Sequence, residues 1–216
     1  MASRLKATSL IDALVVELRE QILDGRIAGG TALTETEVAK QYEVARPTAK
    51  AAIERLTAEG LLRRDAHKSA RVPVFDADDI ADLYFTRACV ERQVMRELAR
   101  RRSVPSAATS AQVEIRKLAE ADDSTIAAVE PDVRFHRSLV DELGSPRLSR
   151  LHASVMAEMR LCMAQVQTYK LLRIAEIADE HQDILDAIAD GDAERADQAL
   201  AVHLNRACEQ LRARIG

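Results

Sequence analysis

The sequence predicts a mainly α protein, with an N-terminal winged helix-turn-helix followed by a C-terminal all-α bundle of six helices. Only 7 glycines and 5 prolines occur in 216 residues, and 47% of the residues are hydrophobic. This composition indicates long helices joined by short connections. The charge also changes along the chain: residues 1–75 hold 12 Lys+Arg and 10 Asp+Glu, whereas residues 76–216 hold 19 and 25. We therefore expect two domains with these bounds, the first one mildly basic.

Two broad classes of protein are excluded by the composition. No apolar run approaches the length of a membrane span, and the N-terminal stretch MASRLKATS lacks the apolar core of a signal peptide. A soluble, cytoplasmic protein without a membrane partner is expected. Cys89, Cys162 and Cys208 are far apart and odd in number. They indicate small core residues, and neither a disulfide framework nor a zinc cluster.

Two closely spaced helices form the centre of the N-terminal domain. Thr34 and Glu37 match a capping box, in which the hydroxyl binds the Glu37 amide while the Glu37 carboxylate reaches back. The second helix contains Pro47 in its first turn, where no intrahelical donor is lost, and Gly60 supplies its stop. A preceding helix, capped by Ser9, is predicted by apolar residues at helical spacing: Ile11, Leu14, Val15, Leu18 and Ile22.

The second of these paired helices begins with cations. Arg46, Thr48 and Lys50 cluster at its N-terminal end, where the helix dipole disfavours positive charge. Binding to a DNA phosphate backbone or to the edge of a guanine base would explain cations at this position. The competing interpretation is an ordinary helical hairpin with solvated charges. We prefer the helix-turn-helix.

A small β-hairpin, or wing, is predicted after these helices. Residues 61–64 and 70–74 read as short strands around a polar tip. Folding alone does not explain so many potentially cationic residues on one hairpin, whereas phosphate contacts do. These residues are Arg63, Arg64, His67, Lys68 and Arg71.

From residue 76 onward the pattern predicts helices and no strand. Asp76 or Asp78 caps the first helix, Pro131 is placed in the first turn of the third, and Asp192 caps the last. This segment is large enough to form a core of its own. The six helices are expected at about residues 76–102, 108–121, 131–144, 145–167, 172–189 and 192–211.

Histidines of the helical domain form a candidate metal site. Asp132 and His136 lie four residues apart and share a helix face, while His181 and His203 lie midway along two later helices. These side chains could converge in the bundle on a Zn²⁺-like divalent ion with an open coordination position. Taken singly, each histidine is more simply a core or surface residue. His152 has no partner in the pattern and is interpreted as structural.

These residues also carry a family resemblance. Residues 44–62 resemble the helix-turn-helix of GntR-family transcriptional regulators. The stretches PDVRFHRSLV, DEHQDILDAIADGD and ALAVHL resemble the FCD effector domain of the FadR-like branch of that family. The resemblance implies a metal bound by Asp132, His136, His181 and His203, with Zn²⁺ preferred and Ni²⁺ or Mn²⁺ as alternatives. It also implies a homodimer whose DNA binding is modulated by a small molecule, often an organic acid.

The chain departs from the family pattern in the predicted DNA-binding domain. Where the family usually reads V-S-R-T-P-V-R-E-A-L, this chain reads VARPTAKAAI, so Arg46 is kept and Lys50 replaces the second arginine. Lysine lacks the bidentate fork that arginine offers to guanine, so the operator of relatives is not assumed. Glu43 replaces a glycine, Thr36 an arginine and His67 the wing glycine. The candidate DNA contacts are Thr36, Arg46, Thr48, Lys50, His67, Lys68 and Arg71.

The residues and the resemblance together imply a transcriptional regulator, with repression preferred over activation. It is expected to act on a pseudo-palindromic double-stranded DNA operator and to respond to a small carboxylate or sugar acid. Arg87 and Glu91 match an RxxxE pattern of the family, and Arg87 is the candidate for pairing with the effector carboxylate. Its alternative role is an i, i+4 pair with Glu91. Two further hypotheses remain: a regulator in which metal occupancy is itself the signal, and a metal-dependent hydrolase or hydratase.

Overall fold

The computed structural model describes residues 9–64, 68–121, 125–166 and 173–215. The chain forms two compact units, Met1–Val74 and Phe75–Gly216. Unit 1 contains α1 (Leu10–Leu23), β1 (Ala32–Leu33), α2 (Glu35–Gln41), α3 (Arg46–Ala58) and β2 (Ala70–Arg71). Unit 2 contains α4 (Ala77–Arg101), α5 (Ser106–Glu120), α6 (Thr125–Asp141), α7 (Pro146–Val166), α8 (Ile174–Asp190) and α9 (Ala193–Ile215). No helix in these described ranges is long and apolar enough to cross a membrane.

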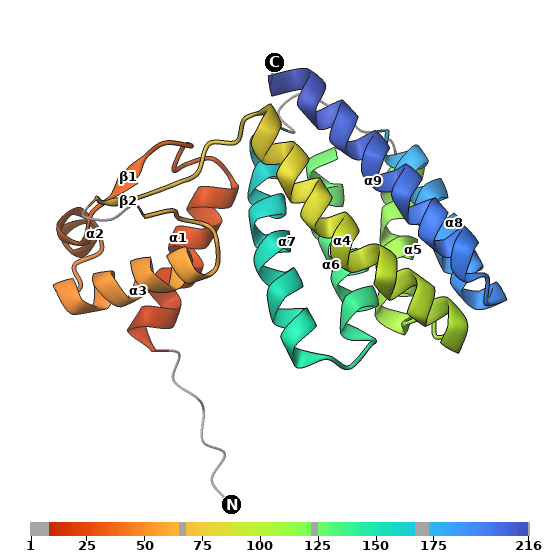
Figure 1. The fold of residues 1–216 in the computed structure, drawn as a ribbon. Helices are drawn as coiled ribbons and strands as arrows, with labels where there is room; N and C mark the ends of the chain where they lie inside the picture. The colour runs from red at the N-terminus through yellow and green to blue at the C-terminus, as the bar shows by residue number, and fades with distance from the viewer. Residues whose placement is uncertain (1–8, 65–67, 122–124, 167–172, 216) are drawn as a thin grey trace, which may run out of the picture. The chain divides into compact units, whose positions relative to one another are not determined.

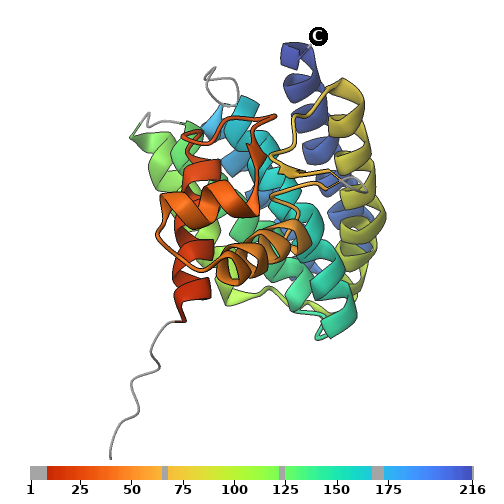
Figure 2. The ribbon, with the colours of Figure 1, turned by 90° about the vertical axis from the view of Figure 1, so that its left-hand side faces the viewer.

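The helices of unit 1 begin where their caps predict. Ser9 and Asp12 form a reciprocal capping box at the start of α1. At α2 the Thr34 hydroxyl accepts from the Glu37 amide at 3.2 Å and donates to the Glu37 carboxylate at 2.7 Å. Helices α1 and α3 then pack on each other (Figures 1 and 2). Their buried contact faces are Leu14, Val15, Leu18 and Ile22 from α1 and Ala49, Ala52, Ile53 and Leu56 from α3.

The wing is present, and its second strand has an additional partner. Arg63 and Arg71 exchange two backbone hydrogen bonds, of 2.8 and 2.9 Å, as the predicted hairpin requires. Strand β2 also pairs antiparallel with β1, with Ala32 opposite Arg71. The sequence did not predict β1, because a strand of two residues shows no alternation of polar and apolar residues. The observed β2 is also shorter than the predicted strand at residues 70–74. That strand would include Pro73, which has no backbone N–H to donate to a neighbouring strand.

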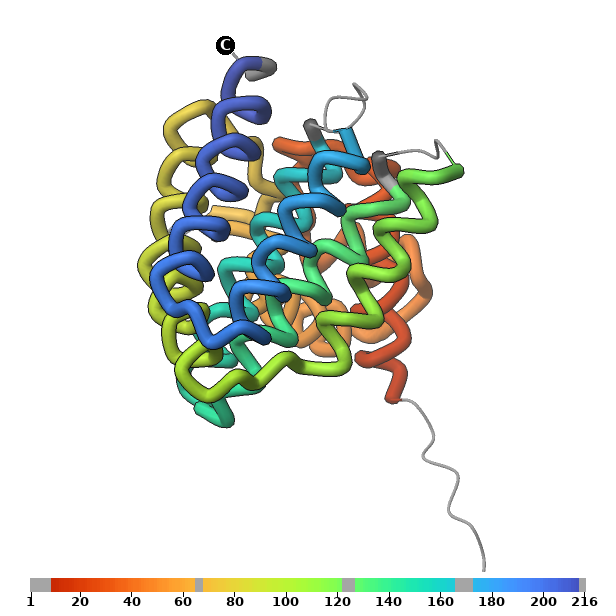
Figure 3. The backbone as a smooth tube through the Cα atoms, turned by 90° about the vertical axis from the view of Figure 1, so that its right-hand side faces the viewer, coloured from red at the N-terminus to blue at the C-terminus, as the bar shows by residue number. Residues whose placement is uncertain are grey.

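The described residues of unit 2 form six helices, as the sequence predicts. Helices α4 and α9 run side by side, and α8 lies next to α9 (Figures 1 and 3). Helix α5 packs on both α6 and α8, and α7 packs on α6 and α4. Asp76 caps α4 through a capping box with Asp79, and the Asp192 carboxylate accepts from the Arg195 amide at 2.9 Å in the first turn of α9. The bundle therefore brings α4, α6, α8 and α9 together around one interior.

The prediction for Pro131 was wrong. Helix α6 begins at Thr125, so Pro131 lies inside it and not in its first turn. An internal proline removes one hydrogen bond and crowds the preceding turn, at a cost of about 3 kcal/mol. Ala128 and Val129 precede Pro131 and are both buried. Their burial holds the N-terminal part of the helix against the core and offsets the local cost of the proline.

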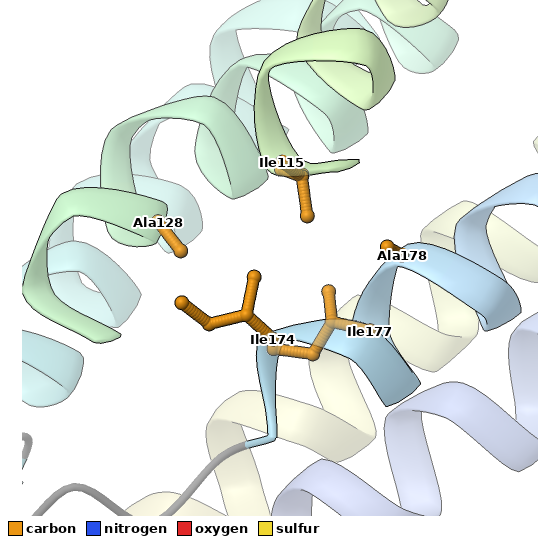
Figure 4. Close-up of a cluster of buried hydrophobic side chains, with 5 residues drawn as sticks. All are labelled: Ile115, Ala128, Ile174, Ile177 and Ala178. Atoms are coloured by element: carbon orange, nitrogen blue, oxygen red, sulfur yellow. The ribbon is translucent and has the colours of Figure 1, made fainter. Parts of the chain in front are cut away.

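A small apolar cluster joins α5, α6 and α8. Ile115, Ala128, Ile174, Ile177 and Ala178 are buried together (Figure 4). Ile177 lies four residues before His181 on the same face of α8. Packing of this cluster therefore holds α8 in an orientation that directs His181 toward the bundle interior.

Candidate metal centre and nucleic-acid interface

The four predicted metal ligands converge in the interior of unit 2. Asp132 and His136 project from α6, His181 from α8 and His203 from α9, and all four are buried. One ligand atom from each of them lies within 4.8 Å of the others. The Oδ1 atom of Asp132 is 3.5 Å from Nε2 of His181 and 3.8 Å from Nε2 of His136. The fold thus brings together the four side chains that the sequence analysis grouped as candidate ligands.

Two carboxylates orient two of the imidazoles. His136 Nδ1 is 2.7 Å from Oε2 of Glu91, and His203 Nδ1 is 2.8 Å from Oε2 of Glu180. Burial opposes ionisation of Glu91, but Arg87, His136 and His152 hold its pKa well below the ordinary value. Burial likewise opposes ionisation of Glu180, but the bonds from His203 and Arg206 lower its pKa to about 2. Both carboxylates are therefore acceptors, and each imidazole donates from Nδ1.

This arrangement leaves the opposite ring nitrogens facing one another. The Nε2 atoms of His136 and His203 are 3.2 Å apart. When both rings are neutral and Nδ1 carries the proton, each Nε2 presents a lone pair, so two acceptors would meet without a donor between them. A cation shared by the two nitrogens removes this conflict, and a carboxylate behind each ligating histidine is the usual arrangement at metal sites.

His181 gives a second indication that a ligand belongs here. Neither of its buried ring nitrogens forms a hydrogen bond with any part of the described chain. Burial, together with His203 and His136, lowers its pKa well below the ordinary value, and burial also lowers the pKa of His136. Both rings are therefore neutral, which is the form that binds metal. Phe135 stacks on the His181 ring, with centroids 3.8 Å apart, and restrains its orientation.

Glu91 is the centre of a buried network that the sequence did not predict. Its Oε1 atom accepts from Arg87 Nε at 2.8 Å and lies 2.9 Å from Nε2 of His152. Arg87 thus forms the i, i+4 pair that was its alternative role. Its Nη2 atom is buried and has no hydrogen-bond partner among the described residues. His152 is not isolated, because it is joined through Glu91 to the ligand His136.

Sequence reasoning missed Glu180 and the role of His152. Glu180 directly precedes the ligand His181, yet its side chain binds His203 on the next helix. It also accepts two hydrogen bonds from Arg206 on that helix. Only the pairing of α8 with α9 brings these groups together, so spacing along the sequence carries no signal for them.

In unit 1, several predicted DNA contacts gather at one surface depression of about 280 Å³. Thr36 of α2, Arg46 of α3 and Lys68 of the wing all line it, and Arg64 joins them. Arg46 is exposed and its Nε lies 3.4 Å from the Glu35 carboxylate. The depression therefore collects cationic side chains from the helix-turn-helix and the wing, as a surface for a polyanion requires.

The remaining predicted contacts do not line this depression or lie outside the described residues. Thr48 and Lys50 follow Arg46 in the first turns of α3, where Lys50 forms an exposed ion pair with Glu54 at 3.7 Å. Arg71 is exposed on β2 and donates to the Gly30 carbonyl at 3.0 Å. His67 lies outside the described residues.

Comparison with known proteins identifies both units. Residues 10–72 match the model of the bacterial regulatory proteins of the gntR family, and residues 82–206 match the FCD domain. The repressor NanR of Enterobacter sp. (strain 638) is 27% identical over 91% of this chain and 83% of its own. The "Probable D-xylose utilization operon transcriptional repressor" of Paenarthrobacter nicotinovorans is 26% identical, covering 92% and 85%. A GntR regulator structure from Rhodococcus sp. RHA1 has a TM-score of 0.76 at 25% identity, covering 93% and 96%.

A winged helix-turn-helix unit joined to an all-α domain defines a DNA-binding transcriptional regulator, not an enzyme. The chain belongs to the GntR family of bacterial regulatory proteins, and its C-terminal part is an FCD domain.

Proposed function

We propose that this regulator is a homodimeric repressor whose operator binding is controlled by a small carboxylate or sugar acid, bound beside a divalent metal ion in unit 2. Asp132, His136, His181 and His203 would hold the ion, with Zn²⁺ preferred and Ni²⁺ or Mn²⁺ as alternatives. The observation that supports this most strongly is the close approach of the Nε2 atoms of His136 and His203, which are 3.2 Å apart while their Nδ1 atoms face carboxylates.

Arg87 is the proposed partner of the effector. Its side chain is 1% exposed, and Nη2 is left without an acceptor in the described chain. A buried donor that lacks a partner costs about 1–3 kcal/mol, and more when the group is charged. A ligand carboxylate that accepts from Nη2 would remove that cost. A bound metal ion would be a second cationic group, besides the Arg87 guanidinium, that attracts the effector carboxylate.

The network around Arg87 supports the proposed control of DNA binding. Glu91 connects Arg87 to the ligand His136 on α6 and to His152 on α7. An effector that binds Arg87 therefore acts on a carboxylate shared by three helices. For this to change operator affinity, the effector must bind the DNA-competent and DNA-incompetent states with different affinities.

The DNA-binding part of the proposal rests on the depression in unit 1. Two copies would place two α3 helices about one turn of B-DNA apart, on a pseudo-palindromic operator. Arg46 would read a base, while Thr36, Thr48, Lys50, Lys68 and Arg71 would contact the backbone or neighbouring bases. His67 is proposed from sequence alone.

A second candidate is a regulator in which metal occupancy is itself the signal. The two ring nitrogens of buried His181 support it, because they form no hydrogen bond in the described chain, and a buried polar atom without a hydrogen bond costs free energy that a bound ion would recover. Under this hypothesis metal alone changes operator affinity, and no organic ligand is needed.

A melting screen distinguishes the two candidates. The full chain, loaded with Zn²⁺ or stripped by a chelator, is heated with small carboxylates and sugar acids, each paired with its neutral amide. A ligand at 100 times its Kd raises stability by about 2.7 kcal/mol. We expect an acid, and not its amide, to raise the Tm of the loaded protein. A Tm that responds to metal but to no acid would support the second candidate, and a Tm that responds to neither would contradict both.

A further inference from the structure

A depression of about 290 Å³, which we call the α5–α8 depression, lies on the surface of unit 2 between these two helices. None of the residues that line it is a candidate metal ligand or part of the network around Glu91. The two helices are held together nearby, where Ile115 of α5 and Ala178 of α8 are buried in one cluster (Figure 4). The lining residues are Gln112, Val113, Arg116, Lys117 and Glu120 from α5 and Gln182 from α8.

Gln112, in the wall of this depression, has a buried polar atom without a partner. Its side chain is 3% exposed, and its Nε2 atom donates to the backbone carbonyl of Ala178 at 2.6 Å. Because a carbonyl only accepts, the nitrogen of the carboxamide and not its oxygen must face Ala178. The Oε1 atom is buried and forms no hydrogen bond with any described residue. A buried acceptor in this state costs about 1–3 kcal/mol, which an N–H group of a ligand would recover.

Arg116 places a cation next to this carboxamide. Its Nη2 atom donates to the same carbonyl of Ala178, at 3.1 Å, so the guanidinium and the Gln112 side chain meet at one atom. Its Nη1 atom is 2.6 Å from the carboxylate of Asp179, but this pair is exposed, and surface ion pairs contribute little to stability. A guanidinium has more N–H groups than these two bonds use, so Arg116 can still donate to a ligand.

The rest of the depression favours a ligand that has an anionic and an apolar part. Lys117 is exposed and forms no ion pair with any residue that the structure describes. Together with Arg116 it gives the lining two cations against the single carboxylate of Glu120, so an anion is attracted. Val113 is 49% exposed and adds an apolar surface to the same wall. The ligand must also supply the donor that Gln112 lacks.

We infer that the α5–α8 depression binds an α-amino acid with an apolar side chain. The ammonium group of the ligand donates to Gln112 Oε1, and its carboxylate accepts from Arg116, with Lys117 as a second cation. Its side chain packs on Val113. An α-amino acid fits because its two charged groups are attached to one carbon, and Gln112 and Arg116 likewise meet at a single carbonyl. Gln112 Oε1 has almost no contact with solvent, so the ligand reaches it by displacing exposed side chains at the rim, such as Lys117 and Gln182.

Isothermal titration calorimetry of the full chain, stripped of metal by a chelator, tests this inference. We expect at least one of L-leucine, L-valine and L-methionine to bind at one site for each chain. For the tightest of them, the acid that lacks the ammonium group and the amide that lacks the carboxylate should each bind about tenfold or more weakly. The matching β-amino acid, with one more carbon between the charged groups, should also bind more weakly. A wild-type chain that binds none of the three, or that binds the acid without an ammonium group equally well, would overturn the inference.

Variants locate the bound amino acid. Arg116→Gln removes the partner of the ligand carboxylate and should weaken binding about tenfold or more. The matched control Arg134→Gln removes an exposed, ion-paired arginine from α6 and should retain wild-type affinity. Gln112→Leu removes the acceptor of the ammonium group and should weaken binding to a similar extent. Arg116 is partly exposed, so its replacement tests the inference even if Gln112→Leu is unstable.

Equal affinity of the wild type and Arg116→Gln would place the bound amino acid elsewhere in the chain and would overturn the inference. The proposed metal and effector site shares no residue with the α5–α8 depression. Failure of this inference therefore leaves the proposed function intact. Because the titration is made on metal-free protein, loss of the metal proposal likewise leaves amino-acid binding in place.

Discussion

The imidazole of His136 and the carboxylate of Glu91 form a buried pair, with Nδ1 and Oε2 2.7 Å apart. Both side chains are essentially inaccessible to solvent, so the pair is weakly screened. It fixes which nitrogen of His136 is directed at the other three candidate ligands. The candidate metal centre therefore depends on a residue that is not one of its ligands.

Replacing Glu91 by Gln should weaken metal binding. The amide preserves the volume but loses the negative charge that makes His136 a stronger ligand, and comparable changes cost about 10–100-fold in metal affinity. Competition with a chromogenic chelator measures this loss. Glu97→Gln, on the exposed side of the same helix, is the matched control and should retain wild-type affinity. Equal affinity of the two variants would show that Glu91 does not support the site.

Replacing His181 by Ala should lower metal content and Tm together. The substitution removes one ligand and opens space beside the stacked ring of Phe135. His152→Gln changes a buried histidine that is bonded to Glu91 but is not a ligand, so it should retain the metal. Elemental analysis alongside thermal melting gives both readouts. Full metal retention by His181→Ala would remove it from the ligand set.

Replacing Arg46 by Ala should weaken operator binding by about 1–3 kcal/mol if its guanidinium reads a base. Lys40→Ala, which removes an exposed cation from the last turn of α2, is the control and should have little effect. Fluorescence anisotropy with a selected operator, repeated at several salt concentrations, separates base reading from phosphate contact. Unchanged affinity would exclude Arg46 from the interface.

Stability in acid should depend on Asp197, which joins α9 to α4. Hydrogen bonds from Arg92, with further attraction from Arg92 and Arg96, hold the pKa of this buried carboxyl below its usual 3.8, despite its desolvation. A folded-state pKa lowered in this way adds stability above the unfolded pKa, and that stability is lost as pH falls through the folded value. Asp197→Asn should therefore cost about 2 kcal/mol at neutral pH. This cost should begin to shrink as the pH falls below 3.8, and it should be lost only below the lower pKa of the folded state. Denaturant unfolding at neutral and at acidic pH measures the difference, and a cost independent of pH would contradict this account.

Replacing Glu43 by Gly should stabilise unit 1. Glu43 has a φ of 52°, a left-handed conformation that costs a residue with a Cβ about 1 kcal/mol. The turn between α2 and α3 requires this conformation, which explains why the family usually has glycine there. Denaturant unfolding should show a gain of about 0.5–1 kcal/mol, less than the full strain because glycine also gains freedom when unfolded. The control Glu54→Gly, in the middle of α3, should lose stability instead.

The parts of the fold that sequence predicted are those determined by local chemistry. The caps at Ser9, Thr34 and Asp76 place three helix starts, because a capping side chain acts within its own turn. Pro131 misled the prediction for α6 because burial of Ala128 and Val129 outweighed a local preference. Strand β1 was missed because it is defined only by its partner β2.

In the candidate metal site, too, local features could be predicted from the sequence and features that depend on helix packing could not. Asp132 and His136 share a helix face, so their proximity followed from spacing. The network of Glu91 with Arg87, His136 and His152 joins three helices that are distant in sequence. Such a network depends on how the helices pack, and a single sequence holds no period or spacing that specifies it.

Native mass spectrometry of the full chain, exposed in turn to Zn²⁺, Ni²⁺ and Mn²⁺ and then desalted, tests the central claim most directly. The account predicts one divalent ion for each chain of the wild type, with Zn²⁺ retained best, and no retained ion in the double variant His136→Ala, His181→Ala. A wild-type chain that retains none of the three ions, or a double variant that retains as much as the wild type, would contradict it.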